Sequence, residues 1–342
     1  MLEDFSLRLN NELKALHHQI FHSQNFVEVD CPVCGSADST LYGVKDAFSY
    51  RRCNVCTMIY MSPRLSDVAT LAFYNSKANE IYNEIKFHGT GSNIDQDNLV
   101  NYHNLEIILK RVGSPSEKSE SLKLLEVGCG SGFFLKSAQN AGFDVYGLEL
   151  NARLLDNAKK LLGVESIYGI DVQECDFPNE QFDVIYLRDV IEHIHSPMSF
   201  LHKLSALLKV GGILFIETHN VDGFIFKAVG IRHTCFFGFE HPVHWSSKTL
   251  GLALDKCGLD FADIKFESQD CTLYEMAHYY RESTFTTIFK SSNNKILDKF
   301  LWVILRFLRI PIIKFLDSLI TPKVANLFGY GSTMKFIAIK SK

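Results

Sequence analysis

A chain of 342 residues, 46% of them hydrophobic, can bury a sizeable core in one large domain and a smaller one. Its net charge of −4 argues against a general nucleic-acid binder, which would normally be basic. The acidic start, Met1 to Phe5, is unlike a signal peptide, so we expect a cytoplasmic protein. In that compartment its nine cysteines predict reduced thiols or metal ligands rather than disulfides.

The first 85 residues are expected to hold a helix and a cysteine-rich module. Apolar residues recur at helical spacing over residues 2–20, which predicts an amphipathic helix. Two Cys-x-x-Cys pairs follow, with eighteen residues between them. Four thiolates complete a tetrahedron and leave no position for water, so they predict a structural zinc ion rather than four free thiols. The predicted ligands are Cys31, Cys34, Cys53 and Cys56.

From residue 122 onwards, apolar segments alternate with amphipathic ones. The predicted strands cover residues 122–127, 144–150, 165–170, 182–187, 212–218, 263–267 and 332–339. Asn151 as N-cap and Gly163 as stop bound one predicted helix. Ser196-Pro197 opens a second helix that Gly211-Gly212 closes, and Ser246 or Ser247 opens a third that stops at Gly258. This alternation predicts an α/β fold with a mostly parallel sheet covered on both faces.

The first predicted strand of this sheet runs into a glycine-rich turn. Gly128, Gly130 and Gly132 are evenly spaced, whereas a dinucleotide fingerprint would place its third glycine at the position of Phe133. The second strand then ends in a carboxylate, Glu149. A strand, a glycine turn, a helix and a strand closed by an acid together predict a nucleotide-binding βαβ unit.

This segment resembles motif I of the class I S-adenosylmethionine (SAM)-dependent methyltransferases. The resemblance implies a Rossmann-like seven-stranded sheet and a Glu149 carboxylate that binds the ribose hydroxyls of SAM. It continues at Asp171-Val172, where the family contacts adenine, and at Arg188, which ends the fourth strand. The implied SAM-binding residues are Glu126, Gly128, Gly130, Gly132, Glu149, Asp171, Val172 and Arg188.

The segment before motif I narrows the resemblance. The cysteine pairs, the Tyr60–Arg64 stretch and Phe73-Tyr74 are similar to elements that precede motif I in bacterial methyltransferases of sugar and polysaccharide tailoring. That similarity implies a small acceptor, such as a glycan or nucleotide sugar. The expected domains are a zinc-knuckle module over residues 1–85, a SAM-binding core over 86–272, a helical cap over 273–330 and a last core strand over 331–342.

The segment from Phe237 to Trp245 is the candidate acceptor side. Because the methyl group of SAM is already activated, the protein must aim the nucleophile and remove its proton. A histidine near neutral pKa suits that task for a hydroxyl, so His241 and His244 are the candidate catalytic residues, the alternative being ordinary surface histidines. The deoxysugar C-methyltransferases have a tyrosine before Glu-His where this chain has Phe239, which favours O-methylation.

Asp189, Glu192 and His193 form a third candidate group. Their spacing resembles the element through which ubiquinone-pathway O-methyltransferases and small-RNA 3′-end methyltransferases hold a divalent ion. The resemblance implies a Mg²⁺- or Mn²⁺-assisted enzyme for a quinone precursor or RNA end, with His219, His241 or His244 as a further ligand. The alternatives are that Glu192 and His193 only pack and hydrogen bond, or that the chain is a non-catalytic zinc-ribbon protein that binds SAM.

The segment Lys295–Leu319 carries basic residues at helical spacing beside a wide apolar face. It is too charged to span a bilayer. We expect it to pack on the core or on a second subunit, the alternative being a peripheral contact with a membrane surface.

Overall fold

The computed structural model describes residues 11–12, 25–74, 76–84, 94–117, 120–267, 320–326 and 328–341. The chain forms two compact units: unit one comprises Met1–Val29 and Pro63–Asp176, and unit two comprises Asp30–Ser62 and Phe177–Lys342. The predicted segment Lys295–Leu319 and most of the predicted N-terminal helix lie outside the described residues. Among the described residues, no helix combines the length and the hydropathy that crossing a membrane requires.

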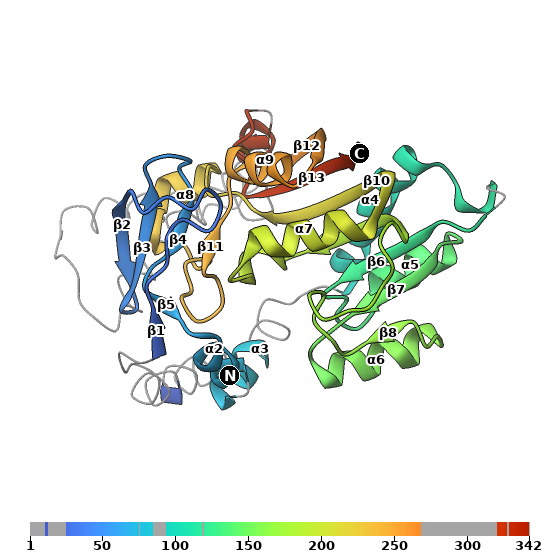
Figure 1. Ribbon diagram of the computed structural model, residues 1–342, viewed down its shortest axis with the longest axis horizontal. Coiled ribbons are helices and arrows are strands. Elements are labelled where there is room, and N and C mark those ends of the chain that lie inside the picture. Colours follow the sequence, from blue (N-terminus) through green and yellow to red (C-terminus); the bar gives the residue numbers. More distant parts are fainter. Residues whose placement is uncertain are drawn as a thin grey trace. The chain divides into compact units, whose positions relative to one another are not determined.

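A seven-stranded sheet has the order β12-β13-β10-β9-β6-β7-β8 (Figure 1). Its strands are β6 (Lys123–Val127), β7 (Asp144–Leu148), β8 (Ile167–Tyr168), β9 (Phe182–Arg188), β10 (Leu208–His219), β12 (Leu259–Glu267) and β13 (Thr333–Lys340). Neighbouring pairs β6–β7, β7–β8 and β9–β10 are parallel, whereas β13 is antiparallel to both β10 and β12. The predicted α/β class with a mostly parallel seven-stranded sheet is confirmed.

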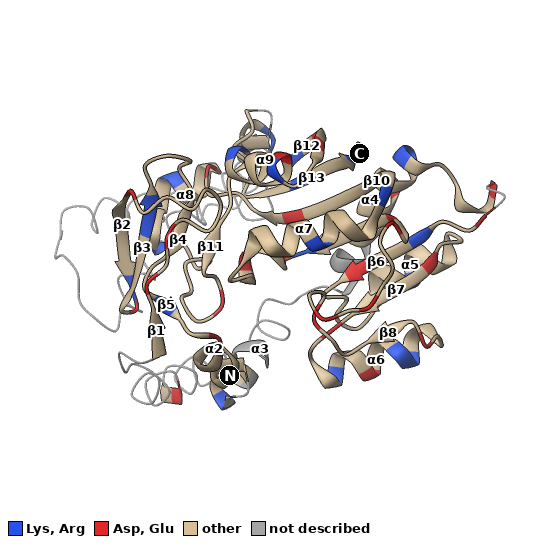
Figure 2. Ribbon diagram, in the orientation of Figure 1, with Lys and Arg blue, Asp and Glu red and all other residues tan. Residues whose placement is uncertain are grey.

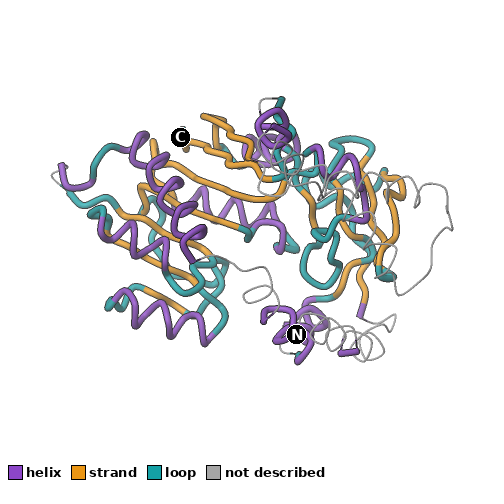
Figure 3. The backbone as a smooth tube through the Cα atoms, turned by 180° about the vertical axis from the view of Figure 1, so that it is seen from behind, coloured by secondary structure: helices purple, strands orange, loops and turns teal. Residues whose placement is uncertain are grey.

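In unit one, helices α5 (Phe133–Asn140) and α6 (Ala152–Leu162) lie against β7 and β8 (Figures 1 and 3). Helix α6 begins and ends as predicted: the Asn151 side chain accepts hydrogen bonds from two backbone N–H groups, and Gly163 has φ 66°. Its exposed side carries both signs of charge (Figure 2), which is the usual solvated face of an amphipathic helix. The remaining elements of unit one are α2 (Asp67–Tyr74), α3 (Lys77–Glu84), α4 (Ile94–Val112) and the 3₁₀ turn η3 (Pro115–Glu117), together with β1 (Phe26–Val27) paired to β5 (Arg64–Leu65).

Unit two holds helices α7 (Pro197–Leu207), α8 (Phe224–Val229) and α9 (Ser247–Lys256), with the 3₁₀ turns η4 (Ile191–His193) and η5 (Gly230–Arg232). Ser246 caps α9 as predicted, in a reciprocal capping box with Thr249. Apolar side chains of α7, α9 and the strands form its core: Leu201, Leu204, Phe215, Ile216, Leu250 and Leu254 are buried.

Three predicted boundaries were wrong, one of them being the start of β12, which lies at Leu259 rather than at residue 263. Helix α7 ends at Leu207, four residues before the predicted glycine stop, because buried Leu208 already pairs with Phe182 and begins β10. The strand register then shifts before Ile213, and Gly211 supplies the left-handed backbone (φ 79°) in that irregular stretch. Strand β8 covers two residues rather than six, because it is an edge strand that pairs with β7 only at Ile167 and Tyr168.

A second, antiparallel sheet of unit two has the order β11-β4-β3-β2. Strands β2 (Ser39–Lys45), β3 (Phe48–Cys53) and β4 (Ile59–Met61) come from the cysteine-rich segment, and β11 (Val243–His244) comes from much later in the chain. Val243 pairs with Tyr60, and His244 pairs with Ile59. Two residues of the candidate acceptor segment, Val243 and His244, therefore form an edge strand of the cysteine-rich sheet, which the sequence did not reveal.

Candidate functional site

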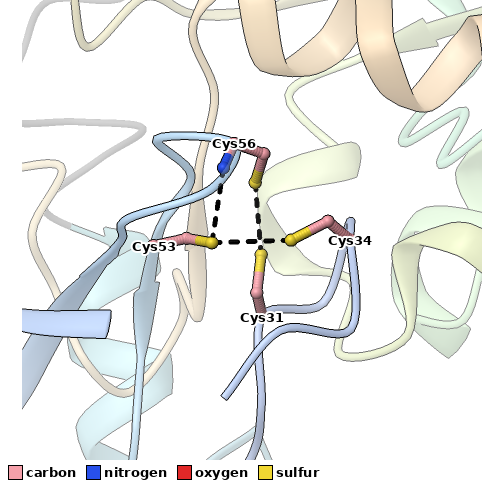
Figure 4. Close-up of side chains that lie close together, drawn as sticks. All are labelled: Cys31, Cys34, Cys53 and Cys56. Atoms are coloured by element: carbon pink, nitrogen blue, oxygen red, sulfur yellow. Dashed lines mark hydrogen bonds between the residues drawn. The ribbon is translucent and has the colours of Figure 1, made fainter. Parts of the chain in front are cut away.

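The four predicted zinc ligands converge on one point (Figure 4). Their sulfur atoms all lie within 4.8 Å of one another, with Cys31 Sγ 3.4 Å from Cys56 Sγ and Cys34 Sγ 3.5 Å from Cys53 Sγ. Tetrahedral zinc with Zn–S bonds of about 2.3 Å places sulfurs about 3.8 Å apart. The cluster therefore fits a single tetrahedral ion.

The two cysteine pairs have the same backbone conformation. Gly35 N–H donates to Cys31 O at 2.8 Å, and Thr57 N–H donates to Cys53 O at 3.0 Å. Each of these two residues follows the second cysteine of its pair, with φ 72° and 71°. The repeated turn aims both thiols of each pair to the same side. Because Thr57 is a β-branched residue in the left-handed region, its backbone strain marks a turn that the surrounding structure enforces.

The environments of these thiols differ. Burial raises the pKa of Cys56 to about 11, even though backbone and Cys31 hydrogen bonds act to lower it. Burial also raises the pKa of Cys53, but hydrogen bonds from the Cys56 and Val55 backbone outweigh it and bring that pKa to about 7. Metal binding by this set therefore releases protons.

In unit one, β6 leads into the predicted glycine turn. Gly128, Gly130 and Gly132 all have positive φ, at 73°, 54° and 82°. The N–H groups of Gly128 and Cys129 both donate to Leu148 O, which fixes the turn to the end of β7. A Cβ on Gly132 would lie 3.1 Å from Ala158 of α6, whereas one on Gly130 would meet no atom of the described residues within 4 Å. Gly132 thus permits helix packing, and Gly130 presents its backbone to open space.

Glu149 braces this turn. Its Oε2 accepts a hydrogen bond from Gly130 N at 2.8 Å, and its Oε1 accepts one from Asn151 N at 2.7 Å. An ionised carboxylate has about four lone-pair sites, so it can accept further hydrogen bonds from two hydroxyls of a ligand. The carboxylate is thus fixed beside the open face of Gly130, a geometry that fits a ribose diol.

The other predicted SAM contacts are divided between the units. Glu126 is buried near the end of β6, Val172 is buried, and Asp171 accepts a hydrogen bond from Gln173 N at 2.8 Å, all in unit one. Arg188 ends β9 in unit two and lies 3.9 Å from the Asp189 carboxylate.

A buried polar chain runs through unit two. Thr218 Oγ1 donates to Glu192 Oε2 at 3.0 Å, and Glu192 Oε1 lies 3.6 Å from His219 Nδ1. His219 Nε2 is in turn 3.2 Å from His244 Nδ1. Burial raises the pKa of Glu192, but the imidazoles of His219 and, more weakly, of His193 and His241 outweigh it and lower that pKa to about 2. Glu192 is thus ionised and orients His219.

His241 and His193 lie beside this chain, with ring centroids 4.6 Å apart. His241 Nδ1 donates to Cys235 O at 2.7 Å, and His193 Nδ1 donates to Glu240 O at 3.1 Å. These bonds require a proton on Nδ1, so in the neutral form of each ring the lone pair is on Nε2. Glu240 Oε2 is buried, has no hydrogen-bond partner among the described residues, and lies 3.9 Å from His241 Nε2. Glu240 is a candidate functional residue that the sequence analysis missed; its position next to His241 was the signal that could have revealed it.

The predicted metal group of Asp189, Glu192 and His193 is not brought together. Asp189 has φ 53° and a side chain 61% exposed, because it precedes the 3₁₀ turn rather than forming part of a helix. Glu192 binds Thr218 instead. Within the described residues, the histidine cluster that gathers ligand atoms within 4.8 Å is His193, Glu240 and His241.

Comparisons with known proteins match the segment that contains the glycine turn and Glu149. Residues 101–264 match the family model described as a methyltransferase domain. This segment, just under half of the chain, is similar to methyltransferase domains. Ubiquinone biosynthesis O-methyltransferases resemble it: the Klebsiella pneumoniae (strain 342) protein is 36% identical in an alignment of 122 residues that covers 33% of this chain and 50% of that protein. The Bordetella avium (strain 197N) protein is 31% identical over 144 residues, 39% of this chain and 57% of its own length.

The chain thus spans about half the length of the curated relatives that it matches. Among solved structures, a SAM-dependent methyltransferase from Archaeoglobus fulgidus aligns with TM-score 0.47 and 18% identity, over 76% of this chain and 99% of that one. A putative S-adenosylmethionine-dependent methyltransferase from Listeria monocytogenes aligns with TM-score 0.44 and 14% identity, over 71% and 98%.

Proposed function

We propose that the chain is a SAM-dependent O-methyltransferase acting on a hydroxyl of a small, sugar-containing acceptor, with structural zinc on Cys31, Cys34, Cys53 and Cys56. The observation that carries the SAM assignment is the Glu149 carboxylate bound to Gly130 N at the open face of the glycine turn. The names of the 36%-identical relatives support O-methylation. The cysteine cluster supports the resemblance to sugar-tailoring enzymes.

In this proposal SAM supplies an electrophilic methyl group, and the residues of the chain do the rest. Glu149 and the glycine turn hold the ribose, with Glu126, Asp171, Val172 and Arg188 as further contacts. His241 Nε2 accepts the proton of the acceptor hydroxyl, while Cys235 O holds the ring by its Nδ1–H. His244 is fully buried, and it supports the acceptor side through His219. The expected core, residues 86–272, contains all of these groups.

Replacing Glu149 by glutamine is expected to weaken SAM binding by about 1.5–3 kcal/mol, because two hydroxyls lose a charged acceptor. Titration calorimetry measures this directly. Glu165→Gln, at an exposed carboxylate of unit one, is the matched control and should bind like the wild type. A wild-type protein that binds no SAM, or a Glu149→Gln variant with unchanged affinity, would contradict the assignment.

The acceptor class is tested with methyl-labelled SAM and a panel of nucleotide sugars and ortho-dihydroxyphenols. Label on a sugar hydroxyl supports the proposal, and label confined to the phenols assigns the quinone-type acceptor instead. The compound that is methylated then serves as the acceptor for the kinetic experiments below.

A second candidate, a metal-assisted O-methyltransferase, is favoured by the cluster of His193, Glu240 and His241 rather than by the predicted Asp189 group. Two imidazoles and one carboxylate are a ligand set for a divalent transition metal. In that case EDTA abolishes methylation and Mn²⁺ restores it. The Glu240→Gln variant is then expected not to respond to Mn²⁺, while elemental analysis still finds zinc on the four cysteines. Methylation that is unaffected by EDTA rejects this candidate.

A further inference from the structure

The cysteine-rich segment and the acceptor-side segment share one sheet in unit two. For this inference, residues 30–62 are called the four-cysteine module and residues 230–246 the histidine loop. Besides the β4–β11 pairing, Met61 N–H donates to Pro242 O at 2.8 Å and Lys45 Nζ donates to His233 O at 2.8 Å. Ile59, which pairs with His244, is the third residue after the ligand Cys56. The metal-binding turn therefore leads directly into β4, the strand that pairs with β11 and its residue His244.

Aromatic side chains join the same two segments. Phe48 meets Phe239 edge-on with ring centroids 5.0 Å apart, and Tyr50 meets Phe236 at 5.1 Å and His244 at 5.4 Å. Each of these five side chains is at most 5% exposed. The histidine loop therefore has an aromatic floor made by the four-cysteine module.

The backbone of Gly238 packs against the ring of Phe48. A Cβ at this position would fall 2.2 Å from Cγ of the Phe48 ring, well inside van der Waals contact. The backbone of the loop thus touches the ring directly, and no side chain fits between them. This contact lies two residues before Glu240 and three before His241.

We propose that the four-cysteine module positions the acceptor side: ordering of its sheet by metal fixes the histidine loop, and with it His244, His219 and His241. The proposal rests on the function proposed above, and it makes Phe48, Tyr50 and Gly238 positioning residues rather than catalytic ones. Coupling runs from Cys56 through β4 and β11 to His244, whose Nδ1 lies 3.2 Å from His219 Nε2. The module is then more than a means of stabilising the fold.

Gly238→Ala separates positioning from metal binding. The added methyl group must push the loop off Phe48, so backbone hydrogen exchange over residues 233–246, followed by mass spectrometry, is expected to accelerate. Zinc content should stay at the wild-type value and SAM affinity within about twofold. Turnover of the acceptor found in the panel should fall by about 10²-fold, the scale of a misplacement near 1 Å. Gly251→Ala is the control, since among the described residues the nearest atom to its Cβ would be Phe336 Cζ at 3.5 Å.

A second substitution that restores exchange and turnover would distinguish positioning of the loop from a general loss of stability. Adding Phe48→Ala to Gly238→Ala removes the ring that clashes, so the double variant is expected to exchange more slowly and turn over faster than Gly238→Ala alone. Wild-type exchange and turnover in Gly238→Ala would overturn the proposal, as would faster exchange without loss of turnover.

A further arm does not depend on the proposed function. Stripping zinc from the wild-type protein with a chelator should accelerate exchange over residues 233–246. Unchanged exchange over these residues overturns the proposal that the four-cysteine module positions the histidine loop, whether or not the protein binds SAM. If the protein binds no SAM but exchange accelerates when zinc is removed, the proposed function is rejected and the positioning of the histidine loop by the four-cysteine module still stands.

Discussion

Replacing Cys31 by serine is expected to remove the metal and unfold the four-cysteine module. A structural zinc ion contributes roughly 10–16 kcal/mol of binding free energy at neutral pH, and a module of this size buries too little surface to replace it. The wild-type protein should hold about one zinc per chain by elemental analysis. The variant should hold none, and the far-ultraviolet signal of the antiparallel sheet should fall.

SAM affinity should survive this change. The glycine turn and Glu149 lie in unit one, whereas the four cysteines lie in unit two. Cys257→Ser is the matched control, because Cys257 is a buried thiol outside the cluster and its loss should leave zinc bound. Metal-free wild-type protein from a preparation without chelators, or full zinc content in Cys31→Ser, contradicts the zinc assignment.

The parts of the molecule that the sequence predicted are those whose determinants are local. A cap such as Asn151 forms its hydrogen bonds with N–H groups two and three residues later, so its type and position suffice. The glycine turn likewise depends on positive φ at three nearby residues. Each cysteine pair closes a turn within five residues, and the two pairs then share one ion.

The rest depends on pairings far apart in the chain. Nothing near Ile59 indicates that its partner is His244, because β11 is two residues long and His244 packs against Tyr50, which lies on another strand of the sheet. The Asp189 group failed for a related reason. Its i, i+3, i+4 spacing would share a face only in a helix, and the backbone leaves the helical region at Asp189 itself.

His241→Ala is expected to lower kcat by about 10²–10⁴, the usual contribution of a positioned general base. Of the two predicted catalytic histidines, His241 is the better placed to meet an acceptor. Its side chain is 12% exposed, whereas His244 is fully enclosed by residues such as Phe236 and Tyr50. The Cys235 carbonyl holds a proton on Nδ1, so in the neutral ring Nε2 has the lone pair that a hydroxyl proton requires.

His241→Asn distinguishes a base from a packing residue. Asparagine can still donate an amide hydrogen to Cys235 O, so it preserves the local hydrogen bond, but it cannot accept a proton at neutral pH. Both variants should lose kcat to a similar extent while SAM affinity stays within about twofold. His202→Ala, at an exposed histidine of α7, is the control and should retain wild-type kcat. Full activity in His241→Ala would show that a group other than His241 accepts the hydroxyl proton. A wild-type kcat in His241→Asn together with a low kcat in His241→Ala would show that His241 acts by holding the loop to Cys235.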